Sequence, residues 1–89
     1  MRDEKVKYFV YVIKSLKNNR QYKGMTKNVE KRLKEHNSGQ TKSTKGYCPW
    51  TLIYTEELNT LEEAINREKY LKSGIGREFI KTWLRSSTE

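Results

Sequence analysis

The sequence predicts an α+β fold: a three-stranded antiparallel sheet flanked by helices, with elements in the order β-β-α-β-α-α. Two runs of β-branched and aromatic residues, at 7–14 and 50–55, are typical of strands. Residues 28–38, 60–72 and 77–85 show apolar residues at helical spacing. Because only 34% of the 89 residues are hydrophobic, we expect one domain with a small core.

The first two strands are expected to pair as an antiparallel hairpin. Residues 7–14 show no polar alternation, which predicts a central strand buried on both faces. An asparagine-containing turn at residues 16–20 leads to a short strand at residues 21–25. Lys23 beside Gly24 indicates that this second strand is exposed on one side, at an edge of the sheet.

The helix at residues 28–38 breaks the usual separation of apolar and polar faces. Asn28 is a suitable N-cap, and Gly39 supplies a left-handed stop after the last turn. Side chains at i, i+3, i+4 and i+7 share its inward face: Val29, Arg32, Leu33 and His36. The other charged side chains, Glu35 among them, should face water. Such a break is expected at a functional site. The alternative is that the arginine extends from the rim of the core to solvent, beside a histidine whose hydrogen bonds are made within the protein.

The second helix repeats this pattern. Thr60 and Glu63 form a capping box for a helix that runs to about residue 72. Its inward stripe is expected to contain Leu61, Ala64, Ile65 and Glu68, with Leu71 beside them. A carboxylate on such a stripe must be paired, hydrogen-bonded or bound to a metal. The partner is either Arg32, in a structural ion pair, or a hard divalent cation that keeps several waters.

The rest of the chain predicts one loop, one helix and two short ends. Residues 39–49 lack periodicity, so we expect a mobile, basic loop without an anchor in the core, at the edge of the site. Residues 73–76 should end the second helix before the last helix begins at Arg77. We therefore predict a flexible arm at 1–6, a single domain at 7–85 and a frayed tail at 86–89.

The formal net charge of +8 is concentrated in one third of the chain. Residues 14–45 hold ten basic and two acidic residues, whereas residues 46–89 hold six basic and seven acidic ones. This concentration suggests a polyanionic partner, with nucleic acid ahead of an anionic membrane, and the alternative is a solvated basic face. The candidate nucleic-acid contacts are Lys14, Lys23, Lys27, Arg32, Lys42 and Lys45.

Several classes of protein are disfavoured by composition. Cys48 is the single cysteine, so it forms neither an internal disulfide nor a thiolate metal cluster, and a reducing, cytoplasmic location is expected. The N-terminus opens with charged residues, unlike a signal peptide. No apolar run is long enough to predict a membrane span.

Two strand tyrosines, Tyr11 and Tyr22, place phenols near the polar residues of the helices. We expect Glu68 to face Arg32 and His36 across the sheet face that carries a tyrosine. Phosphodiester hydrolysis needs a base to activate water, a cation to hold the phosphate and a metal to stabilise the leaving oxygen. A tyrosine with a pKa of about 10 is a poor base, so its pKa would have to be lowered by neighbouring charge. The alternative is that both tyrosines are ordinary core residues.

The runs F-V-Y-V-I-K-S, Y-K-G and E-K-R-L-K-E-H-N-S-G resemble the GIY-YIG nuclease superfamily, and most of all its small single-domain bacterial members. The resemblance continues through P-W-T-L-I-Y and E-E-A-I-N-R-E-K-Y-L-K-S-G and covers residues 7–81. It implies a GIY-YIG-like domain and metal-dependent endonuclease activity on DNA with little sequence specificity, as in DNA repair or processing. A single Mg²⁺ or Mn²⁺ is the implied cofactor.

The resemblance also implies roles for individual residues. Tyr11 and Tyr22 match the tyrosines of the two signature triplets, one of which acts as general base or orients the water. Arg32 matches the arginine that contacts the scissile phosphate, and His36 matches a histidine that assists proton transfer. Glu68 matches the carboxylate that binds the metal.

The two other residues of the second triplet are Lys23 and Gly24. Gly24 matches the glycine of the second triplet and is expected to serve as a structural turn. Lys23 replaces the apolar middle residue of that triplet, so it either faces solvent or adds a phosphate contact.

The family resemblance leaves two alternative functions open. The domain could be a nucleic-acid-binding module that has kept the fold without catalysis. It could also be an interaction protein in which Arg32 and Glu68 form a structural pair. For either nucleic-acid function DNA is favoured over RNA, and no membrane partner is expected.

Overall fold

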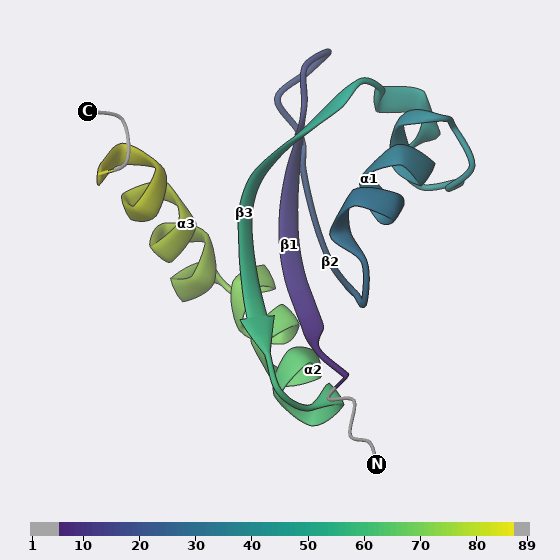
Figure 1. The fold of residues 1–89 in the computed structure, drawn as a ribbon. Helices are drawn as coiled ribbons and strands as arrows, with labels where there is room; N and C mark the ends of the chain where they lie inside the picture. The colour runs from purple at the N-terminus through teal and green to yellow at the C-terminus, as the bar shows by residue number, and fades with distance from the viewer. Residues whose placement is uncertain (1–5, 87–89) are drawn as a thin grey trace.

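The computed structural model describes residues 6–86, and β1 (Tyr8–Ser15) is the central strand of its sheet (Figure 1). The sheet is antiparallel in the order β2-β1-β3, with β2 (Gln21–Thr26) and β3 (Trp50–Leu58) at its edges. The helical elements are α1 (Val29–Asn37), a short 3₁₀ helix (Lys45–Tyr47), α2 (Leu61–Lys72) and α3 (Gly74–Ser86). This architecture confirms the predicted α+β class and element order.

Two small cores lie on opposite faces of β1. Its four central residues, 10–13, are at most 2% exposed, which confirms the prediction of a strand buried on both faces. Side chains alternate between the faces of a strand. Val10 and Val12 therefore pack against α2 and α3, while Tyr11 and Ile13 pack against Trp50 on the side of α1. Figure 1 shows α1 on one side of the sheet and the other two helices on the opposite side.

The predicted turn and cap residues hold the elements in place. Asn19 takes a positive φ of 64° in the hairpin turn, and Gly39 takes 81° after α1. The Asn28 side chain accepts a hydrogen bond from the amide of Lys31, as an N-cap does. Thr60 caps α2 in the same way by accepting from the Glu63 amide.

Two boundaries differ from prediction by three residues, and the others by at most one. β3 continues to Leu58, which pairs with Tyr8 of β1. Glu56, which interrupts the apolar run, accepts hydrogen bonds from Tyr54 and Arg67. α3 begins at Gly74 rather than Arg77. The Ser73 hydroxyl accepts from the amide of Gly76 and so caps a first turn that contains two glycines.

The inward stripe of α2 is narrower than predicted. Ala64 and Leu71 are fully buried, but Leu61 and Ile65 are 48% and 39% exposed, so their assignment to the core was wrong. A three-stranded sheet covers only a strip of the helix surface. Glu68 lies between the two buried residues along this strip and keeps 21% of its side chain exposed.

The segment 39–49 is anchored in the core, contrary to our expectation. Thr44 is 1% exposed, and its carbonyl accepts a hydrogen bond of 3.0 Å from the indole N–H of Trp50. The predicted mobility of this segment stays a prediction. Residues 1–5 of the predicted arm and 87–89 of the predicted tail lie outside the described residues, and Ser86 belongs to α3. Within residues 6–86, no helix has the length and apolar character needed to cross a membrane.

Candidate active site at the edge of the sheet

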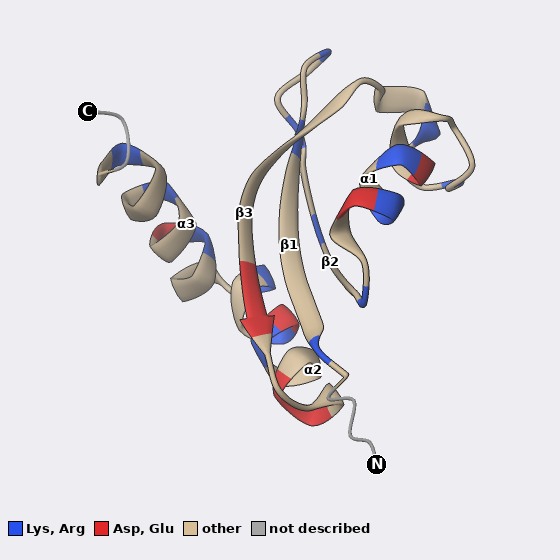
Figure 2. Cartoon of the chain, in the orientation of Figure 1, with Lys and Arg blue, Asp and Glu red and all other residues tan. Residues whose placement is uncertain are grey.

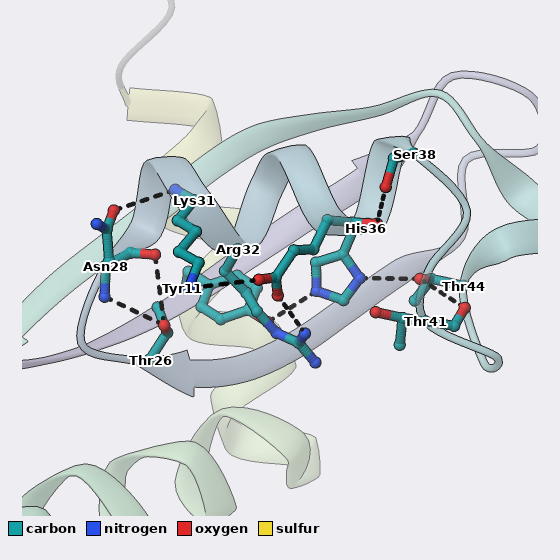
Figure 3. A network of polar contacts seen from close by, with 10 residues as sticks. Tyr11, Thr26, Asn28, Lys31, Arg32, His36, Ser38, Thr41 and Thr44 are labelled. Carbon is teal, nitrogen blue, oxygen red and sulfur yellow. Dashed lines mark hydrogen bonds and ion pairs between the residues drawn. The ribbon is translucent and has the colours of Figure 1, made fainter.

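Tyr11 and His36 form a direct polar contact between β1 and α1. The Tyr11 hydroxyl oxygen lies 2.8 Å from Nε2 of His36, and both residues are almost fully buried (Figure 3). Gly24 is the β2 partner of Tyr11. A Cβ at Gly24 would lie 2.7 Å from the Tyr11 hydroxyl oxygen, so this glycine clears space for the phenol. Our prediction of a structural turn at Gly24 was wrong, because the residue lies within a strand.

The other ring nitrogen of His36 contacts a residue that we did not predict. Nδ1 lies 2.8 Å from Oγ1 of Thr44, whose hydroxyl donates to the carbonyl of Thr41 at 3.4 Å (Figure 3). Since the Thr44 hydroxyl proton is directed at that carbonyl, we assign the Nδ1–H tautomer to His36. Nε2 then has a free lone pair and accepts the hydrogen bond from Tyr11.

Tyr22 completes the aromatic part of the cluster. It pairs with Ile13 across the hairpin and so lies on the same face of the sheet as Tyr11. Its ring centroid lies 4.9 Å from that of His36 and 6.3 Å from that of Tyr11. The two tyrosines and the histidine therefore occupy one site.

Arg32 approaches this cluster from α1 but takes an unexpected partner. Its guanidinium forms an ion pair of 2.8 Å with Glu35, which is half-buried and does not simply face water as predicted. Arg32 also acts on Tyr11, because it lowers the pKa of the phenol against the larger effect of burial. Glu68 pairs instead with Lys72 at 2.8 Å, so the structural Arg32–Glu68 pair that we considered is not formed.

Glu68 reaches the site from the opposite side of the sheet. α2 contacts β1 and β2 on the face away from α1, whereas we expected Glu68 on the face that carries the tyrosines. One hollow at the edge of β2 is lined both by Tyr22, from one face, and by Lys72, the partner of Glu68. Glu68 is close enough to Tyr11 to raise its pKa electrostatically, although this is the smallest of the effects on that phenol.

Burial sets the proton affinities in the cluster. Desolvation raises the pKa of Tyr11 to about 12, with hydrogen bonding from Arg32 opposing it. Burial, helped by the charge of Arg32, lowers the pKa of His36. At pH 7 the phenol is therefore protonated and the imidazole is neutral, so the Tyr11 hydroxyl donates a hydrogen bond and Nε2 of His36 accepts it.

The surroundings of Glu68 limit the kind of metal ion that it could hold. Within residues 6–86, no three His, Cys, Asp or Glu side chains gather as a metal cluster. Mg²⁺ commonly binds through one or two carboxylates and completes its shell with waters and substrate phosphates. A single half-buried carboxylate beside an open hollow is compatible with that kind of site and not with an all-protein cage.

The predicted basic contacts are spread over several elements. Figure 2 shows acidic residues gathered at the end of β3 and the start of α2, away from the turn of the hairpin. Lys27, Lys42 and Lys45 are exposed, and the ammonium of Lys27 lies 5.7 Å from the ring centroid of Tyr8. Lys14 is half-buried on β1. Their contacts with nucleic acid stay predictions.

Comparison with known proteins identifies the family. A profile of the GIY-YIG catalytic domain matches residues 7–78. The chain belongs to the GIY-YIG family. Its β1–β2 hairpin, α1 and α2 all lie inside the matched range, and so do Tyr11, Tyr22, Arg32, His36 and Glu68. Membership indicates a nuclease-like domain whose class of partner is nucleic acid.

Similar GIY-YIG chains are small proteins of the UPF0213 group. SH2523 of Staphylococcus haemolyticus is 41% identical over 76 residues, which are 84% of this chain and 92% of that protein. NP_0776A of Natronomonas pharaonis is 39% identical over 67 residues, 74% of this chain and 78% of that one. The solution NMR structure of BH0048 from Bacillus halodurans matches with a TM-score of 0.54 and 31% identity, covering 86% and 84% of the two chains.

Proposed function

We propose that this GIY-YIG protein is a metal-dependent endonuclease that hydrolyses phosphodiester bonds in DNA with little sequence specificity. The observation that carries the proposal is the hydrogen-bonded series from Tyr11 through His36 to Thr44, beside Arg32 and Glu68. A histidine with a purely structural role in the core needs only hydrogen-bond partners for its two ring nitrogens. Here its acceptor nitrogen meets a buried phenol, and the Tyr22 ring, which lies against both of these rings, lines an open hollow at the edge of β2.

Tyr11 receives the proton of the attacking water in the proposed mechanism. With a pKa of about 12, only about one phenol in 10⁵ is ionised at pH 7, so a free phenolate is too rare to serve. A free phenolate is not needed if His36 takes part. Nε2 of His36, which lies 2.8 Å from the phenol oxygen, accepts the Tyr11 proton while that oxygen takes the proton of the water. The resulting hydroxide attacks phosphorus, and the bond to the leaving oxygen breaks.

Two charged side chains orient the substrate in this scheme. Arg32 binds a non-bridging oxygen of the phosphate, and Glu35 holds its guanidinium in position at 2.8 Å. Glu68 would hold the single Mg²⁺ or Mn²⁺, which supplies charge stabilisation at the leaving oxygen when it is bound. Lys72 would then have to leave its present ion pair with Glu68.

A titration of Mg²⁺ and Mn²⁺ with nicked, flapped, branched and plain duplex DNA tests the proposal. We expect cleavage that requires the metal and disappears in Glu68→Ala, while DNA affinity in chelator stays within about threefold of that of the unmodified protein. Lys69→Ala, on the exposed side of the same helix, is the matched control and should cleave normally. Cleavage that survives in Glu68→Ala would refute the role of Glu68.

One observation favours a second candidate function, that of a nucleic-acid-binding module without catalysis. Glu68 is already neutralised by Lys72, as in a domain that has no use for a metal. The titration above separates the two candidates. Salt-sensitive DNA binding with no cleavage of any substrate at any metal concentration would establish the binding module.

A further inference from the structure

A groove along β2 carries cationic side chains that lie far apart in the sequence. Two neighbouring hollows, of about 280 and 410 Å³, share Lys23 and Arg77 among their lining residues. The first hollow also includes Tyr22 and Lys72, and the second includes Lys81. The hollows adjoin between β2 and α3, because they share Gln21, Lys23 and Arg77 as lining residues, and we call the two together the β2–α3 groove.

The charges of the β2–α3 groove come from three separate elements. Lys23 lies on β2, Lys72 ends α2, and Arg77 and Lys81 lie on α3. None of the residues that line the groove is acidic. Residues 46–89 are slightly acidic as a whole, so the net charge of that segment conceals the three cations that folding places opposite Lys23.

These cations are only partly neutralised within the protein. Within the described part of the chain, no ion pair joins Lys23 or Arg77 to a carboxylate. Lys81 has only a loose pair of 3.6 Å with the exposed Glu78, a kind of contact that contributes little. Burial lowers the pKa of Lys23, and the nearby charges of Arg77 and Lys72 lower it further. Repulsion of this kind is relieved when an anion binds among the cations.

We propose that the β2–α3 groove binds the sugar–phosphate backbone of the nucleic-acid strand that enters the candidate active site. The placement of the strand rests on the proposed function, whereas the binding itself does not. The groove starts at Tyr22 and at Lys72, the partner of Glu68, so it leads directly from the site. Arg77 and Lys81 are one turn apart on α3, about 6 Å along its axis, and can follow successive phosphates of one strand.

A nucleic-acid backbone fits this groove better than a membrane does. Amphipathic helices that bind anionic lipids present cations around a protruding apolar face. Here the cations line a depression, and the charges follow its length instead of spreading over a flat surface. The groove also explains Lys23 in the second signature triplet, because its side chain faces α2 and α3 and not open solvent.

Binding of fluorescent oligonucleotides in chelator tests this proposal independently of cleavage. The groove variant is Lys23→Gln/Arg77→Gln/Lys81→Gln, which leaves the Glu68–Lys72 pair intact. The matched control, Lys7→Gln/Lys17→Gln/Lys69→Gln, removes the same charge outside the groove and outside the candidate site. Circular dichroism and thermal melting check that both variants are folded.

The expected difference lies in the salt dependence. Each lost phosphate contact makes the slope of log K against log salt less negative by about 0.9 for duplex and about 0.7 for single strands. The groove variant should therefore change the slope by about 2.7 or 2.1, and the control by less than about 0.5. Equal changes of the salt slope in both variants would overturn the proposal. It would also be overturned if the groove variant lost binding to phosphatidylserine vesicles but kept its DNA affinity.

A second measurement identifies the bound surface directly. Titration of the unmodified protein with a short single strand in chelator should shift the amide resonances of residues 21–23 and 77–81. Shifts confined to the segment 39–49 would overturn the groove assignment. If the protein binds through the groove but never cleaves with metal, the endonuclease proposal fails and the groove stands. If the protein cleaves with metal but the two charge variants bind DNA alike, the groove proposal fails and the endonuclease proposal stands.

Discussion

Thr44→Val tests the proton relay formed by Tyr11, His36 and Thr44. It removes the hydroxyl that accepts from Nδ1 of His36 at 2.8 Å and preserves the branched shape of the side chain. The Thr44 carbonyl still accepts the indole N–H of Trp50, so the anchor of the loop remains. What changes is that Nδ1–H loses its partner at a histidine with no exposed surface.

The size of the effect follows from the burial of His36. An unpaired buried donor costs about 1–3 kcal/mol, and each kcal/mol lowers the melting temperature of a domain this small by about 4–8 °C. His36 can avoid part of the cost by moving its proton to Nε2 and donating to the Tyr11 oxygen. That tautomer cannot accept the Tyr11 proton, so the same 1–3 kcal/mol lowers cleavage about 5- to 150-fold.

Nitrogen NMR and melting curves measure both consequences. The His36 ring should change from the Nδ1–H to the Nε2–H tautomer in Thr44→Val and return in Thr44→Ser, which restores the hydroxyl. Thr41→Val is the control, because residue 41 contributes only its carbonyl to the network. An unchanged tautomer, together with a melting temperature within about 1 °C of the original, would refute the relay.

Three further predictions concern stability, space and charge. Burial lowers the pKa of His36, so below about pH 6.5 the unfolded state binds more protons than the folded state does. In denaturant titrations the free energy of unfolding should therefore fall from pH 7 toward pH 5.5, and it should fall less steeply in His36→Gln. Gly24→Ala should lower the free energy of unfolding by about 1–3 kcal/mol and separate the Tyr11 hydroxyl from His36, because the new methyl group meets that hydroxyl. An unchanged melting temperature would contradict the close approach of Tyr11 to Gly24. Binding to duplex DNA should show a slope of log K against log salt near −4.5 if about five phosphates are neutralised, and a slope shallower than about −1 would exclude nucleic acid as the partner.

Local signals predicted the elements of this fold well. Asn28 and Thr60 mark helix starts because a side-chain oxygen accepts a nearby amide, and this interaction needs no distant partner. β1 is recognisable as the central strand because burial on both faces removes polar alternation. The start of α3 was missed, since two glycines obscure a helix that Ser73 nevertheless caps.

Long-range contacts in the site could not be predicted in this way. Periodicity indicated that Arg32, His36 and Glu68 lie on inward faces, but it contains no information on which sheet face each helix covers. Glu68 therefore reaches the site from the side that we did not expect. Thr44 lies in a segment without periodicity, and only the fold shows that it contacts His36.

The central claim, that Tyr11 receives the proton of the attacking water and passes its own to His36, is tested most directly by single-turnover cleavage with Tyr11→Phe. The substitution removes one oxygen, so the fold and the DNA affinity in chelator should be retained, at a cost in stability of about 1–3 kcal/mol for the buried Nε2 of His36 that loses its partner. We predict that the cleavage rate falls by about 10²- to 10⁴-fold, as expected for loss of a proton-transfer group. A rate within about threefold of the original would contradict the claim.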